Sequence, residues 1–168
     1  MRMNRKERKH IAHIRKSRGY SFERDIIERY RTAGWWCYRT GSSSSYLPDV
    51  LAINDIKGEL VALEAKSGTS DHLYVGWDQI SRNIFVAEGF KRYPERKVVL
   101  AFKFLSKRKN REGGYATREL KEYFKLFSRE LYERYKGKVI SCHYGRGCPE
   151  LPDYIPPFKI KQNKKSIN

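Results

Sequence analysis

The chain has 168 residues, of which 39% are hydrophobic and 14% aromatic, so it is long and apolar enough for one packed domain and is not typical of a disordered protein. Its 36 lysines and arginines against 19 acids give a formal net charge of +17, which predicts a polyanionic partner, most simply nucleic acid. No segment resembles a membrane span or a secretory signal, so we expect a cytoplasmic protein, or one of the host-cell cytoplasm if it is viral.

The three cysteines, Cys37, Cys142 and Cys148, form a sparse and odd set that favours a reducing compartment over a disulfide framework. Cys37 lies between aromatic residues in an apolar run, which is typical of a packed core thiol. Cys142 and Cys148 flank His143, but the four paired ligands of a structural zinc site are missing, so we do not expect zinc there.

The N-terminal part of the chain is strongly basic. Residues 1–17 form a basic arm, which we expect to be solvated and irregular in the free protein and to order on DNA. Ser21 is the expected N-cap of an amphipathic helix that ends near Gly34. Glu23 falls in the first turn of that helix. Its acidic side chain either only interacts favourably with the helix dipole or also reaches an active site.

Strands follow the helix. One strand is predicted over 35–39, and the small-residue loop over 40–46 would either let the backbone approach a phosphate closely or act only as a connector. Two apolar, β-branched runs at 47–53 and 59–66 flank a polar turn at 54–58 and predict a β-hairpin. The loop of small residues therefore leads directly into the hairpin.

Asp49 and Glu64 are the most informative pair in the sequence. Symmetric pairing about the turn puts them directly opposite each other, with Cβ atoms about 5 Å apart. Lys66 follows Glu64 by two residues and therefore returns to the same face of the strand. Two like charges that face each other are destabilising unless a cation neutralises them, and carboxylate oxygens suit Mg²⁺. The pattern predicts a site where two carboxylates and a lysine meet at one phosphate.

A solvated surface hairpin is the simpler alternative, because this spacing of acids and lysine is common. Both faces of the two strands are apolar, however, which predicts that the strands are buried. We expect the face of the acids to carry Leu51, Ile53, Val61 and Leu63, and the other face to carry Val50, Ala52, Leu60 and Ala62. Charges at the ends of buried strands are costly without a partner, which favours the metal site.

Beyond the hairpin, the pattern predicts a loop or short extended segment over 67–75, a helix over 78–90 and a strand over 98–104. The order of helix, strand, hairpin, helix and strand is typical of an α/β fold with a mixed sheet flanked by helices. We expect a single domain, in which a catalytic core over 18–108 precedes a C-terminal extension over 109–168.

The extension is less clear in its pattern. The stretch 117–135 fits either one long helix or a strand at 123–127 that finishes the sheet, and the periodicity does not separate the two. A short strand is expected over 138–141. From residue 149 onward, the proline-rich and then lysine-rich composition predicts an irregular, mobile tail.

Six short segments between residues 17 and 105 occur in an order that is found in one nuclease family. They are GYSFER at 19–24, YRTGS at 38–42, PDVLA at 48–52, EAK at 64–66, DHLYVG at 71–76 and VLAFKF at 99–104. Together they resemble the archaeal Holliday-junction resolvases, members of the PD-(D/E)xK nuclease superfamily with a restriction-endonuclease-like fold. This chain is longer at both ends than is usual for that family, which leaves different partners open for those parts.

The resemblance implies roles for individual residues. It makes Glu23, Asp49 and Glu64 the acids of the metal site and Lys66 the lysine near the attacking water. The carbonyl of Ala65, on the same strand, is a further candidate metal ligand. Further residues have candidate roles in holding DNA, and these are Arg24, Arg39, a serine of 42–45 (Ser42 or Ser43 foremost) and His72, which is equally compatible with a turn residue.

The leading hypothesis is a structure-selective endonuclease of DNA recombination and repair, which resolves four-way (Holliday) junctions. The resemblance implies a homodimer that cuts two opposed strands with Mg²⁺, for which Mn²⁺ can substitute. Two alternatives stay open: another PD-(D/E)xK nickase or restriction-type nuclease that acts on duplex DNA, and a non-catalytic basic nucleic-acid-binding protein. The last explains the charge of +17 but not the paired acids on buried strands.

Overall fold

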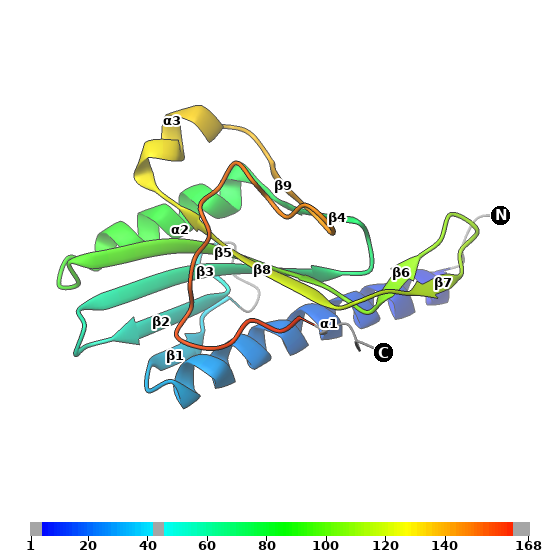
Figure 1. Cartoon of the computed structure of the whole chain (residues 1–168), viewed down its shortest axis with the longest axis horizontal. Helices are drawn as coiled ribbons and strands as arrows, with labels where there is room; N and C mark the ends of the chain where they lie inside the picture. The colour runs from blue at the N-terminus through cyan, green and yellow to red at the C-terminus, as the bar shows by residue number, and fades with distance from the viewer. Residues whose placement is uncertain (1–4, 42–45, 163–168) are drawn as a thin grey trace, which may run out of the picture.

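The computed structural model describes residues 5–41 and 46–162 and contains a five-stranded mixed sheet with a helix on each face (Figure 1). The strands follow the order β1-β2-β3-β5-β8, and only the central β3–β5 pair is parallel. Their bounds are β1 (Trp36–Arg39), β2 (Val50–Asn54), β3 (Glu59–Gly68), β5 (Glu95–Phe104) and β8 (Lys121–Phe127). Helix α1 (Arg5–Thr32) covers one face and α2 (Trp77–Gly89) the other, which confirms the predicted α/β architecture.

Each face of the sheet has its own hydrophobic core. On the first face, Phe22, Ile26 and Tyr30 of α1 recur every four residues and pack onto the sheet, where Ala52 and Leu63 are fully buried. The apolar stripe that predicted the helix therefore also fixes which side of it faces the sheet.

The second face is covered by α2 and by a small two-stranded sheet. Ile80 of α2 shares its core with Leu60 and Leu100 of the central strands. Strand β4 (His72–Val75) pairs antiparallel with β9 (Ile140–His143) over the same core. The segment 67–75, predicted as loop or extended, therefore continues β3 to Gly68 and then forms β4.

The side-chain alternation in β3 differs from the sequence prediction. Val61 and Leu63 lie in the core on the α1 side, whereas Leu60 and Ala62 lie in the core on the α2 side. Because side chains in a strand alternate with a period of two, Glu64 shares its face with Leu60 and Ala62. The predicted grouping of Val61 and Leu63 with the acids is therefore wrong, although the burial of both faces is confirmed.

Helix α1 is longer than predicted, because it begins at Arg5. Ser21 thus lies inside the helix and is not its N-cap, and the part of the basic arm from residue 5 onward is helical. Lysine, arginine and glutamate are good helix formers, so a basic stretch can continue a helix without an apolar stripe. No helix within the described residues is long and apolar enough to cross a membrane.

The stretch 117–135 forms strand β8 and then two short helical turns, η1 (Arg129–Leu131) and α3 (Tyr132–Tyr135). This outcome selects the strand over the single long helix, because Phe124 and Phe127 on β8 complete the two cores. Before it, β6 (Lys107–Lys109) and β7 (Tyr115–Thr117) form a separate hairpin that projects from the sheet (Figure 1).

Residues 149–162 cross the sheet, bridge to β8 at two points and continue beside α1 (Figure 1), so the prediction of a mobile tail is wrong for them. The N–H of Leu126 donates to the carbonyl of Pro152 at 2.9 Å, and that of Tyr154 donates to the carbonyl of Phe124 at 2.9 Å. The segment covers an edge strand whose backbone groups would otherwise face solvent.

The three cysteines are packed inside the protein. Burial raises the pKa of the Cys37 and Cys142 thiols to about 12 and that of Cys148 to about 11. The prediction that Cys37 is a core thiol is confirmed.

Candidate active site

The β2–β3 hairpin brings Asp49 and Glu64 opposite each other. Val50 pairs with Leu63 in the antiparallel register, so the preceding residue, Asp49, faces Glu64. The Oδ2 atom of Asp49 accepts a hydrogen bond from the backbone N–H of Ala65 at 2.9 Å. This bond fixes the carboxylate at the end of the hairpin, next to the second acid.

Glu64 is the most enclosed acid of the site, with 1% of its surface exposed. Its Oε1 accepts hydrogen bonds from Lys66 Nζ at 2.8 Å and Gln79 Nε2 at 2.7 Å, and its Oε2 accepts one from Arg82 Nη2 at 2.8 Å. Burial raises the pKa of the Glu64 carboxyl, and the charge of Asp49 raises it further, although Lys66 and Arg82 act in the opposite sense. The effect of burial on this pKa thus outweighs that of the cations beside the carboxylate.

Helix α1 contributes a third acid, Glu23, of which 9% is exposed. Its carboxylate accepts a hydrogen bond from Arg39 Nε of β1, and the guanidinium of Arg39 lies 4.1 Å from the ring centroid of Tyr20. Burial raises the pKa of the Glu23 carboxyl, Arg39 opposes this, and the charge of Asp49 adds to it. Glu23 and Glu64 thus both carry a pKa that the nearby Asp49 raises.

The loop before β2 closes tightly on Asp49. The N–H groups of Thr40 and Gly41 both point to the carbonyl of Asp49, at 3.1 and 3.4 Å. A Cβ atom on Gly41 would lie 3.0 Å from the carbonyl oxygen of Pro48 and 3.2 Å from Asp49 Oδ1, so only glycine fits here without a shift. The next residues of this loop, Ser42 and Ser43, lie outside the described residues.

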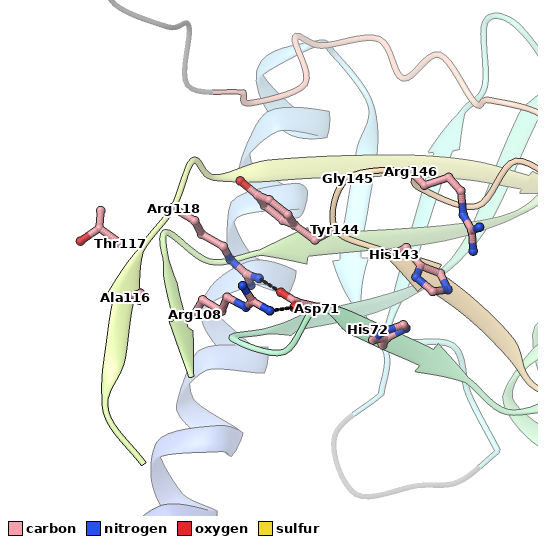
Figure 2. Close-up of a pocket in the computed structure, with 10 residues that line it drawn as sticks. All are labelled: Asp71, His72, Arg108, Ala116, Thr117, Arg118, His143, Tyr144, Gly145 and Arg146. Carbon is pink, nitrogen blue, oxygen red and sulfur yellow. Dashed lines mark hydrogen bonds and ion pairs between the residues drawn. The ribbon is translucent and has the colours of Figure 1, made fainter. Parts of the chain in front are cut away.

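These side chains line one cavity of 360 Å³, which we call the acidic cleft. The predicted site residues that it brings together are Glu23, Arg39, Asp49, Glu64, Ala65 and Lys66. Arg24 is exposed on α1 and does not line the cleft, because the next position on a helix points about 100° away. His72 lines a different cavity (Figure 2).

Two residues of α2, Gln79 and Arg82, line the acidic cleft and were not predicted. Gln79 donates to Glu64 and accepts a hydrogen bond from the N–H of Gly76 at 3.3 Å, so it ties the start of α2 to the acid. Arg82 follows three residues later on the same side of the helix. The only signal in the sequence is this spacing of two polar residues, which is equally typical of a solvated helix face.

The donor atoms of the acidic cleft fit a hard divalent cation. Asp49 and Glu64 offer carboxylate oxygens, and the carbonyl of Ala65 leaves β3 on the same side as the N–H that bonds Asp49. Burial, and to a lesser extent the charge of Asp49, raises the pKa of Glu23 and Glu64, and a cation bound beside these carboxylates would favour their ionised form. Across residues 5–41 and 46–162 no three His, Cys, Asp or Glu side chains are arranged around a metal position as they stand, because basic side chains hold two of the acids.

Comparison with known proteins gives two matches of interest. A family model described as archaeal Holliday junction resolvase (Hjc) matches residues 14–111. Among solved structures, the 1.6 Å structure of Hjc, a Holliday junction resolvase from the archaeal hyperthermophile Archaeoglobus fulgidus, matches with a TM-score of 0.52 and 22% identity over 81% of this chain and 91% of that chain. No curated protein sequence matches the chain.

The structural likeness, at this identity, supports the shared fold. The family match covers more than half of the chain and contains every described residue of the acidic cleft. It ends before β7, so the last third of the chain lies outside it. The chain belongs to the archaeal Holliday junction resolvase family, a family of junction-resolving endonucleases.

Proposed function

We propose that the acidic cleft resolves four-way DNA junctions by metal-dependent phosphodiester hydrolysis, with one cut made by each cleft. The observation that carries this proposal is the position of Asp49 opposite Glu64, with Lys66 hydrogen-bonded to Glu64. Simple DNA binding does not account for two acids that face each other in an open cleft of a chain with a net charge of +17, because carboxylates repel phosphates.

Asp49, Glu64 and the carbonyl of Ala65 would hold Mg²⁺, or Mn²⁺ in its place, and Glu23 would complete the set directly or through water. A cation held by these residues would polarise the scissile phosphate and would lower the pKa of a bound water. Gln79 keeps the carboxylate of Glu64 in one orientation, which is the usual task of residues behind a metal ligand.

Lys66 and Arg39 supply the positive charge that faces the substrate. The ammonium of Lys66 lies 2.8 Å from Glu64 and its side chain is 26% exposed, so it reaches solvent in the cleft. A compact cation at this position orients the attacking water and stabilises the charge that develops on the phosphate. Arg39 is fixed by Glu23 and Tyr20, and its planar guanidinium suits a non-bridging phosphate oxygen.

One cleft breaks one strand, whereas resolution of a junction needs two cuts related by symmetry. A homodimer with two-fold symmetry that presents both clefts to one junction is the economical arrangement. We propose that the protein acts as such a dimer on branched DNA in the cytoplasm.

A fixed four-way junction, a flap and a linear duplex of matched sequence test this function. We expect paired nicks on opposed strands of the junction that require Mg²⁺, stop with EDTA and return when Mg²⁺ is restored. Equal cutting of the linear duplex would instead identify a duplex-acting nuclease. Tight binding with no Mg²⁺-dependent cutting would leave only a basic DNA-binding protein.

A further inference from the structure

A second cavity, of 690 Å³, lies beyond the end of β3 and is lined mainly by basic and aromatic side chains (Figure 2). We call it the basic cleft. Its walls come from β4, from the β6–β7 hairpin and from the turn after β9. The residues that matter here are Asp71, His72, Arg108, Arg118, His143 and Arg146. Three of them, Arg118, His143 and Arg146, lie outside the stretch matched by the family model.

Arg118 joins the basic cleft to the nuclease core. Its guanidinium donates to Asp71 Oδ1 at 2.8 Å and to the carbonyls of Leu105 at 2.8 Å and Ser70 at 3.1 Å, and its side chain is only 7% exposed. Arg108 pairs with the other carboxylate oxygen of Asp71, as Figure 2 shows. Asp71, the one acid among the described residues that line this cleft, is thus paired with two arginines, and these pairs also hold the wall of the cleft in place.

The turn that carries Arg146 is held in a fixed shape. The backbones of His143 and Gly147 exchange hydrogen bonds at 2.9 and 2.8 Å. The N–H of Tyr144 donates to the carbonyl of Asp71 at 2.9 Å, which fastens the turn to the segment before β4. Arg146 itself is exposed, and among the described residues it has no carboxylate partner. This hydrogen-bonded turn therefore presents the guanidinium of Arg146 to solvent.

Two imidazoles lie beside this guanidinium (Figure 2). His72 and His143 are directly paired across β4 and β9, with ring centroids 4.0 Å apart. Partial burial lowers the pKa of His143, and the neighbouring His72 and Arg146 lower it further, while Glu150 acts in the opposite sense. In the neutral form each ring still offers one N–H donor. Three guanidinium groups less one carboxylate leave the cleft with a formal charge of +2.

The basic cleft lies close to the acidic cleft along the chain. Asp71 follows Lys66 by five residues, a stretch that spans at most about 17 Å when fully extended. Duplex DNA carries about one phosphate charge per 1.7 Å of its axis, so a helix that passes both clefts would present several phosphates between them. The two clefts are therefore within the reach of one DNA molecule.

We infer that the basic cleft binds backbone phosphates of the DNA whose strand lies in the acidic cleft, at a point away from the cut; the inference rests on the proposed function. Arginine forks and imidazole N–H groups are suitable donors for phosphate oxygens. The part of the chain outside the family match thus enlarges the DNA-binding surface, while the chemistry stays in the acidic cleft.

The test is the salt dependence of junction binding by full-length Arg146→Gln, measured without Mg²⁺ so that cutting plays no part. Loss of one phosphate contact should lower the slope of log K against log [salt] by about 0.9 and weaken binding about ten-fold at low salt. Arg146→Lys keeps the positive charge and should retain most of the slope. Arg92→Gln is the matched control, because Arg92 is also exposed but precedes β5, and the basic cleft lies past the other end of that strand.

If Arg146→Gln binds with the same affinity and slope as Arg92→Gln, the inference is overturned. Single-turnover cutting by Arg146→Gln should need a higher protein concentration for its half-maximal rate than cutting by Arg92→Gln, because DNA binding is weakened. If the unmodified protein binds but never cuts junctions, the proposed function fails, and the slope measurement still decides whether the basic cleft binds phosphate.

Discussion

Two groups of acids and cations each include a residue of α1, and these two residues, Glu23 and Asp25, are two positions apart in the sequence. The surroundings of the two groups differ. The first group is the acidic cleft, to which α1 contributes Glu23. The second is a closed network that α1 enters through Asp25, and it includes Glu122 of β8, whose side chain is fully buried. Both groups contain glutamates held by arginine and lysine, so the presence of buried ion pairs alone does not identify a site.

In the closed network both carboxylate oxygens of Glu122 accept hydrogen bonds, although Arg29 Nε is buried without a hydrogen-bond partner in the described part of the chain. Arg29 donates to both oxygens of Glu122, at 2.9 and 3.2 Å, and the backbone N–H of Lys161 adds a third bond at 2.9 Å. Burial alone would raise the pKa of Asp25, but hydrogen bonding to Lys161 and the charge of Arg29 lower it overall. Since Lys161 belongs to the C-terminal segment, this network fastens that segment to α1 and β8.

The direction of the pKa shifts separates the two groups. The pKa of Asp25 is lowered, whereas the pKa values of Glu23 and Glu64 are raised, first because burial disfavours the ionised carboxyl and further because Asp49 lies nearby. The cations around Asp25 therefore favour its ionised form, whereas the enclosure of Glu23 and Glu64 disfavours theirs, which a metal ion bound in the acidic cleft, as we propose, would offset. We expect substitutions in the first to change stability and substitutions in the second to change activity.

The largest effect is expected for Glu64→Gln, which should reduce nicking by about 10³-fold or more while junction binding survives. The free energy of unfolding should change little. The pKa of Glu64 is higher in the folded than in the unfolded protein, so its carboxyl contributes stability only below the unfolded pKa and none at neutral pH. The measurement is single-turnover cutting together with thermal unfolding. Unchanged cutting would remove Glu64 from the catalytic set.

Glu122→Ala should have the opposite signature. Removing one partner of a buried ion pair leaves uncompensated charge and typically costs about 3–5 kcal/mol in the free energy of unfolding. Cutting per folded molecule should stay the same. Denaturant unfolding measures the loss, and Glu130→Ala, at an exposed position, is the control. A stable but inactive Glu122→Ala protein would contradict the division between the two groups.

Gln79→Leu should have an intermediate effect on activity. Loss of a residue that orients a metal ligand typically lowers metal affinity about 10–100-fold. We therefore expect the Mg²⁺ concentration for half-maximal cutting to rise while the rate at saturating Mg²⁺ is largely restored. Ser81→Ala on the same helix should leave both values unchanged. A fall in the saturated rate with no change in Mg²⁺ dependence would show that Gln79 does not act through the metal site.

Gly41→Ala should give a smaller loss, of about 1 kcal/mol in activation free energy or a few-fold in rate. The added Cβ would press on Pro48 and Asp49 and shift the carboxylate slightly. Gly114→Ala is the matched control, because a Cβ there meets no atom within 4 Å. Equal rates for the two variants would show that the loop does not position Asp49.

The smallest effects concern pH. Metal binding requires ionised carboxylates, so the affinity for Mg²⁺ should fall as the pH drops through a value above the ordinary glutamate pKa of 4.5. Asp25 behaves in the opposite sense, because its pKa is lower in the folded protein than the ordinary value of 3.8. Its ionised carboxyl therefore stabilises the fold above pH 3.8, and this stability is lost as the pH falls through the folded pKa. Calorimetric titration of metal at several pH values and acid unfolding test these signs, and metal affinity unchanged down to pH 4 would contradict the first.

The sequence was sufficient for the parts of the site that local geometry determines. The turn between β2 and β3 sets the hairpin register, so the opposition of Asp49 and Glu64 follows from counting residues. Helix α1 below Ser21 was missed because its basic stretch lacks an apolar stripe, and the helix is recognisable only from propensity.

Other parts depend on tertiary contacts that no local pattern reports. Gln79 and Arg82 reach Glu64 only because α2 packs against the face of the sheet that carries Glu64. In the sequence the two residues lie 15 and 18 positions after Glu64. The segment 149–162 is ordered by pairing with β8, and its proline-rich composition reads as a tail when that partner is unknown. Long-range packing, rather than propensity, therefore decided both outcomes.

The most direct test of the central claim is a crystal structure of the protein soaked with Mn²⁺, examined for anomalous scattering. We expect an ion in the acidic cleft with oxygen ligands from Asp49, Glu64 and the carbonyl of Ala65, and no such ion in Glu64→Gln. An ion bound only elsewhere, or an acidic cleft that stays empty at millimolar Mn²⁺, would contradict this expectation.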